Sequence, residues 1–298
     1  MKQSIALFEN LPSSADVIVV GAGLAGYCAA LEAADSGARV VLLEKQPAAG
    51  GSSVLSGGFM AFAGTPLQAA AGIHDDDALL FQDLRAVGGK EADQALLEVY
   101  VREQRALYDW LVERGVKFLA LERSAGQSVA RSHQTDPQSL LDTLARQLAG
   151  HANAVMVTKA ALHSLLRHEV DGPVTGVMVV VDGEKRTIAC KGGIVLASGG
   201  FSRSESLLSL FAPAQASAVR IGGAGNTGDG LRQAWKLGAG MRDMAQIRGT
   251  FGTHPACTSE KHEILLAYYL GAIIVNQQGK RFVDESRPYK QLGDACLQ

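Results

Sequence analysis

The order of apolar and polar positions near the start of the chain predicts a strand, a helix and a second strand in quick succession. Residues 17–20 form a continuous apolar run, as expected of a strand that is buried on both faces. An alanine-rich stretch from Leu24 ends at Ser36-Gly37, a pair typical of a helix C-terminus. The second strand covers residues 39–43 and ends at the acidic Glu44. This succession predicts an α/β fold.

Between residues 75 and 197 the pattern changes from helical to strand-like. An acidic cluster at residues 75–77 opens a helical region, and apolar residues recur at helical spacing through residue 111 and again in residues 137–150. The positions expected to pack into the core are Leu97, Tyr100, Leu107, Trp110, Leu111, Leu140, Leu141, Leu144 and Leu148. Two β-branched runs then flank a DGEK turn at residues 182–185 and predict a small antiparallel meander, before residues 194–197 rejoin the parallel sheet.

Three glycines between the first strand and the first helix fall in the pattern G-x-G-x-x-G. Gly21 would form the tight turn, Gly23 would let a pyrophosphate approach the backbone, and Gly26 would let helix and strand pack closely. Glu44, roughly 20 residues after the glycines, suits hydrogen bonds to ribose hydroxyls. Dinucleotide binding is therefore predicted, with a solvated charge at a strand end as the alternative for Glu44.

Composition narrows the range of partners. The 298 residues include 34 glycines without a strict repeat, and the net charge of −2 gives no electrostatic reason to expect nucleic acid or an anionic membrane as a partner. No apolar run is long enough to span a bilayer. Four separated cysteines and no signal-peptide pattern favour reduced thiols in a cytoplasmic protein. The histidines lack metal-ligand spacing, so no metal site is expected; Arg131 and His133 are predicted to lie in a polar loop.

A second glycine-rich stretch directly after Glu44 favours FAD over NAD as the dinucleotide. Residues 50–58 contain the pairs Gly50-Gly51 and Gly57-Gly58, with Ser52 and Ser53 between them. A simple NAD dehydrogenase needs no such loop. FAD extends through its ribityl chain to the flavin ring, and backbone N–H groups of a second loop can serve its pyrophosphate and ring. An NAD-dependent dehydrogenase is kept as the alternative class.

Four motifs in order then identify a family. DVIVVGAGLAG, EKQPAAGGSSVLSGGFM, IVLASGGF and GNTGDGL together resemble the fumarate reductase/succinate dehydrogenase flavoprotein family, which includes soluble fumarate reductases, urocanate reductase-like enzymes and 3-ketosteroid dehydrogenases. The resemblance runs from Asp16 to about Ala295. It implies a doubly wound parallel sheet of the glutathione-reductase type with a small antiparallel β-meander. An FAD-binding domain over residues 1–238 and the start of an α+β capping domain over residues 239–298 are expected.

The resemblance also implies which residues contact FAD. Ala25 resembles a pyrophosphate contact, Glu44 resembles the adenosine-ribose ligand, and Asp229 matches an aspartate that contacts FAD, with a helix N-cap as its alternative role. Residues 50–60 lack the histidine that membrane-bound relatives join covalently to the flavin, so non-covalent FAD is expected. The full expected set is Gly21, Gly23, Ala25, Gly26, Glu44, Lys45, Gly51, Ser52, Ser53, Gly57, Gly58, Gly199 and Asp229.

Catalytic residues are expected in the cap, where residues 271–286 are predicted to form a strand, a turn at Gln278-Gly279 and a second strand. His254-Pro255 resembles the family's His-Pro, whose histidine holds a substrate carboxylate or carbonyl oxygen and stabilises charge that develops there. Glu285 matches a glutamate of a proton-delivery route, and Arg287 lies near the arginine that shares this role. The alternatives are a loop histidine before a turn-forming proline, and a surface ion pair between Glu285 and Arg287.

The resemblance implies a redox activity for the parent protein. We expect hydride transfer between non-covalent FAD and a C–C bond next to a carboxylate or carbonyl of a small-molecule substrate, with an unidentified electron donor or acceptor. Members of the family continue through the rest of the cap, which carries the acid, and then a further glycine-rich segment. The chain is therefore expected to be truncated at its C-terminus, and a catalytically incomplete FAD-binding fragment is the alternative function.

Overall fold

The computed structural model describes residues 11–247, 249, 251–254, 265, 267–287 and 289–297. The chain forms two compact units. The first consists of Met1–Leu55 and Leu141–Ile247, and the second of Ser56–Leu140 and Arg248–Gln298. The boundary expected after residue 238 stays a prediction.

The first unit is built on a six-stranded sheet in the order β6-β2-β1-β9-β8-β7. The pairs β6-β2, β2-β1 and β1-β9 are parallel, whereas β9-β8 and β8-β7 are antiparallel. The strands are β1 (Ser14–Val20), β2 (Val40–Leu43), β6 (Ala154–Val157), β7 (Ala160–Leu166), β8 (Gly176–Val181) and β9 (Glu184–Leu196). The helices are α1 (Leu24–Asp35), α5 (Pro137–Gly150), most of which belongs to this unit, α6 (Glu205–Phe211) and α7 (Asp229–Lys236). The predicted α/β class with a parallel sheet and a meander is confirmed.

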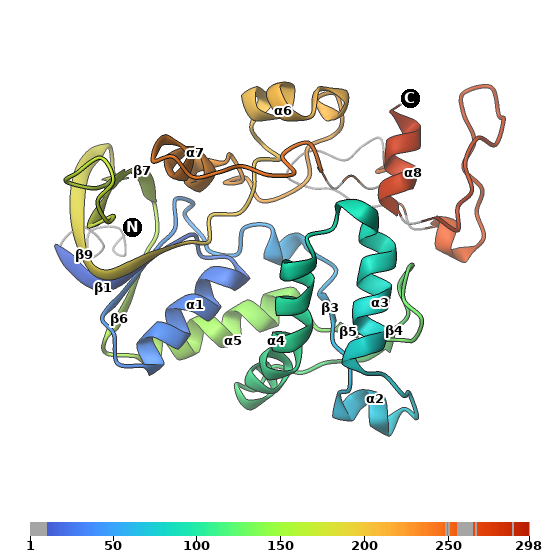
Figure 1. The fold of residues 1–298 in the computed structure, drawn as a ribbon, viewed down its shortest axis with the longest axis horizontal. Helices are drawn as coiled ribbons and strands as arrows, with labels where there is room; N and C mark the ends of the chain where they lie inside the picture. Colours follow the sequence, from blue (N-terminus) through green and yellow to red (C-terminus); the bar gives the residue numbers. More distant parts are fainter. Residues whose placement is uncertain are drawn as a thin grey trace. The chain divides into compact units, whose positions relative to one another are not determined.

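Helices α1 and α5 lie alongside each other in Figure 1, next to the parallel strands. His151, just after α5, lies 3.1 Å from the carboxylate of Asp35 at the end of α1. Asn153 donates hydrogen bonds to the backbone oxygens of Ala34 and Ala38, which join the connection before β6 to the end of α1. These polar contacts fix the ends of the two helices, while Leu144 and Leu148 on α5 are buried.

Strand β9 is longer than the sequence pattern predicts. The meander strand and the strand expected at residues 194–197 are one continuous strand of 13 residues. Its first half pairs with β8 from Glu184 to Ala189, and its second half pairs with β1 up to Leu196. The turn before it uses Asp182 and Gly183, both with positive φ (49° and 84°), as a two-residue β-hairpin requires.

The second unit combines a small antiparallel sheet with helices. Its sheet has the order β3-β5-β4. Its elements are α2 (Pro66–Ala70), α3 (Asp77–Gly88), α4 (Gln94–Glu113), α8 (Tyr289–Cys296), β3 (Phe59–Ala61), β4 (Ala120–Glu122) and β5 (Ser132–Gln134). Short 3₁₀ turns in the two units cover Ser53–Leu55, Gly89–Glu91, Pro213–Gln215 and Ala267–Leu270.

His133 does not lie in a polar loop as predicted. It is on β5, fully buried, and its ring packs with Phe62, Tyr108 and Phe118. Nδ1 lies 2.8 Å from the carbonyl oxygen of Arg131 and must donate to it, while Nε2 lies 2.8 Å from the hydroxyl of Thr65. Burial lowers the pKa of His133. The residue is therefore a neutral part of the core.

Two further predictions for the second unit are partly wrong. On α4, Tyr108 and Leu111 are buried, but Tyr100 and Leu107, which were expected in the core, are exposed. The two strands expected around the turn at Gln278-Gly279 reduce to a single bridge between Val275 and Arg281. Both bridge residues are exposed, while the neighbouring Ile274 is buried with Tyr268 and Leu292.

Candidate functional site

Four of the predicted cofactor residues lie at one edge of the first unit's sheet. Gly21 follows β1, Glu44 and Lys45 follow β2, and Gly199 lies just beyond β9. Because these strands are parallel, their carboxyl ends meet at the same edge, which is where open α/β sheets bind ligands. In the sheet, β1 lies between β2 and β9. The chain continues from β1 to β2 on one side of it, and later returns as β9 on the other side.

Two of the three glycines of the first motif, Gly21 and Gly26, are required by the backbone. Gly21 has φ of 103°, and a Cβ there would lie 2.5 Å from the carbonyl oxygen of Ala197. A Cβ on Gly26 would lie 1.8 Å from the carbonyl oxygen of Gly21, so only glycine lets α1 approach the β1 turn so closely. At Gly23 the nearest atom to a Cβ would be Ser53 Oγ at 3.4 Å. No contact within the protein therefore requires a glycine at residue 23.

Glu44 is held rigidly and is only 7% exposed. One carboxylate oxygen accepts a hydrogen bond from the N–H of Ala22 (3.0 Å), and the other accepts one from the N–H of Gln46 (2.8 Å). This geometry does not fit a solvated charge at a strand end. Since each carboxylate oxygen can accept a further bond, Glu44 has capacity for two hydroxyl donors.

Ser52 and Ser53 fasten the second glycine loop to its neighbours. Ser53 Oγ accepts a hydrogen bond from the N–H of Leu24 at the start of α1 (3.1 Å), and Ser52 Oγ accepts one from the N–H of Gly223 (3.0 Å). Gly51, between these contacts, has φ of 52° and open space where a Cβ would be. The oxygens of the two serines thus hold the loop against α1 and against residues 222–223.

Lys45 and Asp229 form an ion pair with each other. The Lys45 ammonium lies 2.5 Å from Asp229 Oδ2 and 2.6 Å from Thr227 Oγ1, and Thr227 in turn donates to Asp229 Oδ1. Asp229 is the first residue of α7, whose N-cap is Gly228, so the alternative role of N-cap does not fit. The pair ties the end of β2 to the loop before α7.

The loop at residues 222–228 makes contacts near the predicted cofactor residues that the sequence motifs do not predict. The side-chain oxygen of Asn226 lies where a Cβ on Gly199 would meet it at 2.9 Å, and its amide nitrogen donates to Ser202 Oγ. Arg203 donates from two guanidinium nitrogens to the carbonyl oxygen of Gly222. The signal was present in the glycine-rich GNTGDG stretch, from which only Asp229 was selected.

Gly57 and Gly58 belong to the second unit. Gly58 has φ of 73°, and a Cβ there would lie 1.9 Å from the carbonyl oxygen of Thr135. Thr135 donates its N–H to the Gly58 oxygen at 2.9 Å, so the loop and the end of β5 are tightly joined. A Cβ on Gly57 would touch the ring of Phe59 at 3.1 Å. Packing within the unit explains why residue 58 is a glycine. Contact of Gly57 and Gly58 with the flavin stays a prediction.

The three predicted catalytic residues lie in the second unit as well. His254 is exposed at the end of residues 251–254, and Pro255 is outside the described residues. Glu285 accepts a hydrogen bond from the N–H of Ile274 (2.7 Å) and pairs with Arg281, not with Arg287. The hydrogen bonds from Arg281 and then from Ile274 lower the pKa of Glu285 to about 2. The alternative of a Glu285–Arg287 ion pair is therefore wrong, and Arg287 is exposed.

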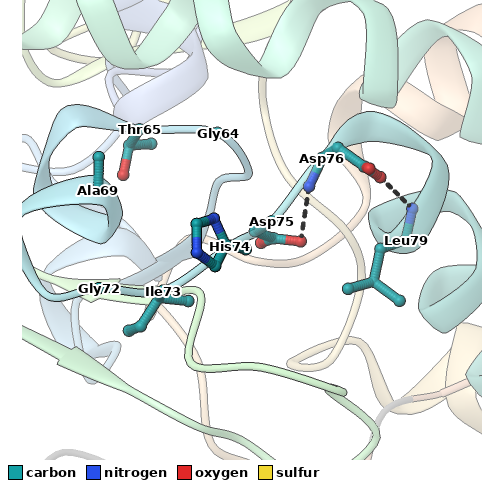
Figure 2. Close-up of a pocket in the computed structure, with 9 residues that line it drawn as sticks. All are labelled: Gly64, Thr65, Ala69, Gly72, Ile73, His74, Asp75, Asp76 and Leu79. Atoms are coloured by element: carbon teal, nitrogen blue, oxygen red, sulfur yellow. Dashed lines mark hydrogen bonds between the residues drawn. The ribbon is translucent and has the colours of Figure 1, made fainter.

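A cleft of about 450 Å³ in the second unit lies between α2 and the start of α3 (Figure 2). Asp75 on its wall accepts a hydrogen bond from the N–H of Asp76, and the Asp76 carboxylate caps α3 by accepting one from Leu79. Asp75 is also paired at 2.8 Å with the buried Arg131. None of the predicted site residues lines this cleft. Within the described residues there is no cluster of His, Cys, Asp or Glu that could hold a metal ion.

The residues of the first unit fit a dinucleotide. The N–H of Tyr27 donates to the carbonyl oxygen of Gly23 in the first turn of α1, so the N–H groups of Ala25 and Gly26 lie at the open end of the helix, where anions bind. Ala25 is exposed, and no other atom lies within 4 Å of the place where a Cβ on Gly51 would be. Together with the Glu44 carboxylate, this edge offers donors to a pyrophosphate and acceptors to a ribose.

A family model described as an FAD binding domain matches residues 16–298. The chain belongs to this FAD-binding family. The match therefore supports FAD as the cofactor of the site at the carboxyl edge of the sheet.

Named relatives agree with this membership. The chain is 32% identical over 297 residues to an NADH:fumarate oxidoreductase of Klebsiella pneumoniae, covering 97% of this chain and 31% of the relative. It is 32% identical to a urocanate reductase of Eggerthella lenta, covering 93% of this chain and 47% of the relative. The structure of the open conformation of a flavocytochrome c3 fumarate reductase matches with a TM-score of 0.84 and 27% identity, over 100% of this chain and 52% of that one.

This member of the FAD-binding family spans about half the length, or less, of the relatives that it matches. These relatives are named for the reduction of fumarate and of urocanate. Among the described helices none is both long and apolar enough to cross a membrane.

Proposed function

We propose that the full-length protein is an FAD-dependent oxidoreductase that transfers hydride between non-covalent FAD and a C–C bond next to a carboxylate or carbonyl. The observation that supports this best is the buried Glu44 carboxylate, fixed between two backbone N–H groups beside the glycine turn. Bound FAD supplies the two-electron hydride carrier. The names of the fumarate and urocanate reductases support the substrate class, because both substrates are unsaturated acids.

The residues of this chain would divide the work between binding and proton handling. Glu44 would hold the ribose, and the N–H groups at the start of α1 would hold the pyrophosphate. His254 would donate a hydrogen bond to the substrate's carboxylate or carbonyl oxygen and stabilise negative charge that develops there. Hydrogen bonds from Arg281 and Ile274 lower the pKa of Glu285 to about 2, so its carboxylate is ionised near neutral pH. On a proton-delivery route it would therefore be protonated only transiently.

Non-covalent attachment of FAD gives the first prediction. Residues 50–60 contain no histidine, so acid precipitation of the FAD-loaded protein should release free yellow flavin into the supernatant. The measurement is the flavin absorbance of supernatant and pellet. Flavin that stays with the pellet after repeated washing would show a covalent link, and failure to load FAD at all would remove FAD as the cofactor.

The chemistry gives the second prediction, for the protein extended by its natural continuation. With a reduced viologen as electron donor under anaerobic conditions, it should reduce an unsaturated acid or an enone. His254→Ala should lower kcat by about 10²–10³-fold, as expected when one donor to a developing oxyanion is lost. The Kd for FAD should stay unchanged.

The control for this assay is His163→Ala, which removes an exposed histidine from β7 in the other unit. It should leave kcat and the FAD Kd at their original values. A His254→Ala protein with full kcat, or one whose loss is traced to weaker FAD binding, would remove His254 from the chemistry. An FAD-loaded protein that reduces neither class of acceptor would contradict the proposed reaction.

A further inference from the structure

Residues 222–228 form a strap that reaches across the carboxyl edge of the first unit's sheet. On one side the strap contacts the segment after β2, where Thr227 Oγ1 lies 2.6 Å from the Lys45 ammonium. On the other side it contacts the segment after β9, where the Asn226 amide donates to Ser202 Oγ at 2.8 Å. Because β1 lies between β2 and β9 in the sheet, the strap spans the end of β1 and the glycine turn that follows it.

The strap is attached differently on its two sides. Toward β9, the N–H of Arg203 donates to the backbone oxygen of Asn226 at 2.9 Å, and its guanidinium donates to the backbone of the first strap residue. Toward β2, no backbone–backbone hydrogen bond joins the strap to residues 44–55 within the described part of the chain. The hydrogen bonds found there use the side chains of Lys45 and Ser52. The β2 side is therefore the side that opens with the smaller loss of contacts.

Lys45, Thr227 and Asp229 form a closed set of contacts, which we call the clasp. The Lys45 ammonium lies 2.5 Å from Asp229 Oδ2, and the Thr227 hydroxyl donates to Asp229 Oδ1 at 2.8 Å. Since a threonine hydroxyl has one proton to donate, its oxygen accepts from Lys45 at the same time. The Lys45 and Asp229 side chains are 22% and 30% exposed, so water can replace these bonds when the clasp opens.

The closed strap lies directly on the second glycine loop. A Cβ on Gly223 would be 2.6 Å from the carbonyl carbon of Gly51, so no ligand atom fits between the two backbones. A Cβ on Gly51 itself would meet no atom beyond the adjoining residues within 4 Å, so space for a ligand remains on its other side. The site can therefore hold a dinucleotide while the strap is closed, but the strap blocks the way in between these two loops.

We propose that the strap is a gate for FAD, which opens at the clasp to admit or release the cofactor and is closed in both the empty and the FAD-bound protein. The proposal rests on FAD as the cofactor of this site. The seven strap residues carry no large apolar side chain, so opening exposes little apolar surface and breaks mainly the clasp and the bond between Ser52 and Gly223. A gate of this kind controls how fast FAD exchanges and not how tightly it binds.

Thr227→Val tests the gate, because Thr227 is outside the set of residues expected to contact FAD. The substitution keeps the branched shape of the side chain and removes the hydroxyl that contacts both Lys45 and Asp229. Rates of FAD association and dissociation are measured in the full-length protein, by stopped-flow fluorescence and by transfer of bound FAD to an excess of a competing apoflavoprotein. Both rates should rise about tenfold, since each of the two lost hydrogen bonds contributes a factor of about 2–12, and Kd should change by less than about threefold.

A second measurement does not involve FAD. The N–H of Gly223 donates to Ser52 Oγ at 3.0 Å while the strap is closed. Hydrogen exchange of that amide in the protein without FAD, followed by mass spectrometry, should be about tenfold faster in Thr227→Val. Thr187→Val is the matched control, because it makes the same change at an exposed threonine of β9 in the same unit. It should leave the amide exchange and both FAD rates unchanged.

In the unmutated protein, the association rate should reach a plateau at high FAD concentration, because opening of the strap then limits it. A rate that keeps rising in proportion to FAD, or unchanged rates in FAD-loaded Thr227→Val, would overturn the gate alone. Faster dissociation with unchanged association would show direct contact of Thr227 with FAD in place of a gate. A protein that loads no FAD would remove the cofactor itself, and with it the gate.

Discussion

Gly26→Ala is expected to destabilise the first unit severely, while Gly23→Ala leaves its fold nearly unchanged and weakens FAD binding. At residue 26 the new methyl group would lie 1.8 Å from the carbonyl oxygen of Gly21, an atom of the tight turn after β1 that cannot move independently. Either α1 or the turn must shift, and strain of this kind costs about 3 kcal/mol or more. The free energy of unfolding, measured in urea without FAD, should fall by that amount.

Gly23→Ala is the matched control, because the same methyl group is added within the same motif. Its nearest neighbour would be Ser53 Oγ at 3.4 Å, an ordinary contact, and φ is −83°. Alanine is a weaker N-cap than glycine, so a loss of about 0.5–1 kcal/mol is expected. If a pyrophosphate lies against this backbone, the methyl group should raise the FAD Kd by about 10–100-fold, the loss of one charge-assisted hydrogen bond. A stable Gly26→Ala protein, or unchanged FAD affinity in Gly23→Ala, would contradict the roles given to these glycines.

Glu44→Ala should weaken FAD binding by at least about 10–100-fold, since charge-assisted bonds to ribose hydroxyls contribute about 1.5–3 kcal/mol each before compensation. The same substitution also leaves the N–H groups of Ala22 and Gln46 without their acceptor, which should destabilise the protein without FAD by about 1–3 kcal/mol. Two measurements are therefore needed: the FAD Kd by titration, and the free energy of unfolding in the absence of FAD.

Glu32→Ala is the control for Glu44→Ala, because it removes an exposed carboxylate from α1 in the same unit. It should change neither the FAD Kd nor the unfolding free energy by more than about 0.5 kcal/mol. Loss of stability with an unchanged Kd in folded Glu44→Ala protein would show that Glu44 only braces the loop. Loss of affinity beyond the loss of stability would support contact with the ribose.

The sequence predicted the β1-α1-β2 succession well because the signals there are local. The buried run at residues 17–20, the glycine spacing and the Ser36-Gly37 ending each constrain a few neighbouring residues, and all of them agree. The same holds for the Asp182-Gly183 turn, where positive φ at both residues follows from the hairpin. Elements of this kind need no knowledge of distant packing.

The features that were missed depend on partners far apart in the chain. Histidine is a polar residue type, yet His133 is buried because its ring packs with Phe62 and Tyr108 and hydrogen-bonds with Thr65. These partners lie 71, 25 and 68 residues before it in the chain. The single long β9 arises because one strand can serve two neighbours, β8 and β1, at different points along its length. The apolar face of α4 was misjudged because helical spacing shows which residues share a face but not whether anything covers it.

For the candidate site, residue types could be predicted but several pairings could not. Glu44 was selected by its distance from the glycines, and its two backbone partners become visible only in the folded unit. Lys45 and Asp229 were both chosen as FAD contacts, although they form an ion pair with each other across 184 positions of the chain. Glu285 was paired with Arg287 by proximity in sequence, whereas a helix-like spacing of four residues brings it to Arg281.

The pairing of β1 with β9 has a consequence for synthesis on the ribosome. β2 follows β1 within about two dozen residues, but Ile194, the register partner of Ile18, is added 176 residues later. At about 5–20 residues per second, roughly 8–30 s pass between synthesis of β2, which completes one side of β1, and synthesis of Ile194 on the other side. During that interval the nascent chain carries an unsatisfied apolar strand, so its yield in cells should depend on chaperones that bind it between the two events.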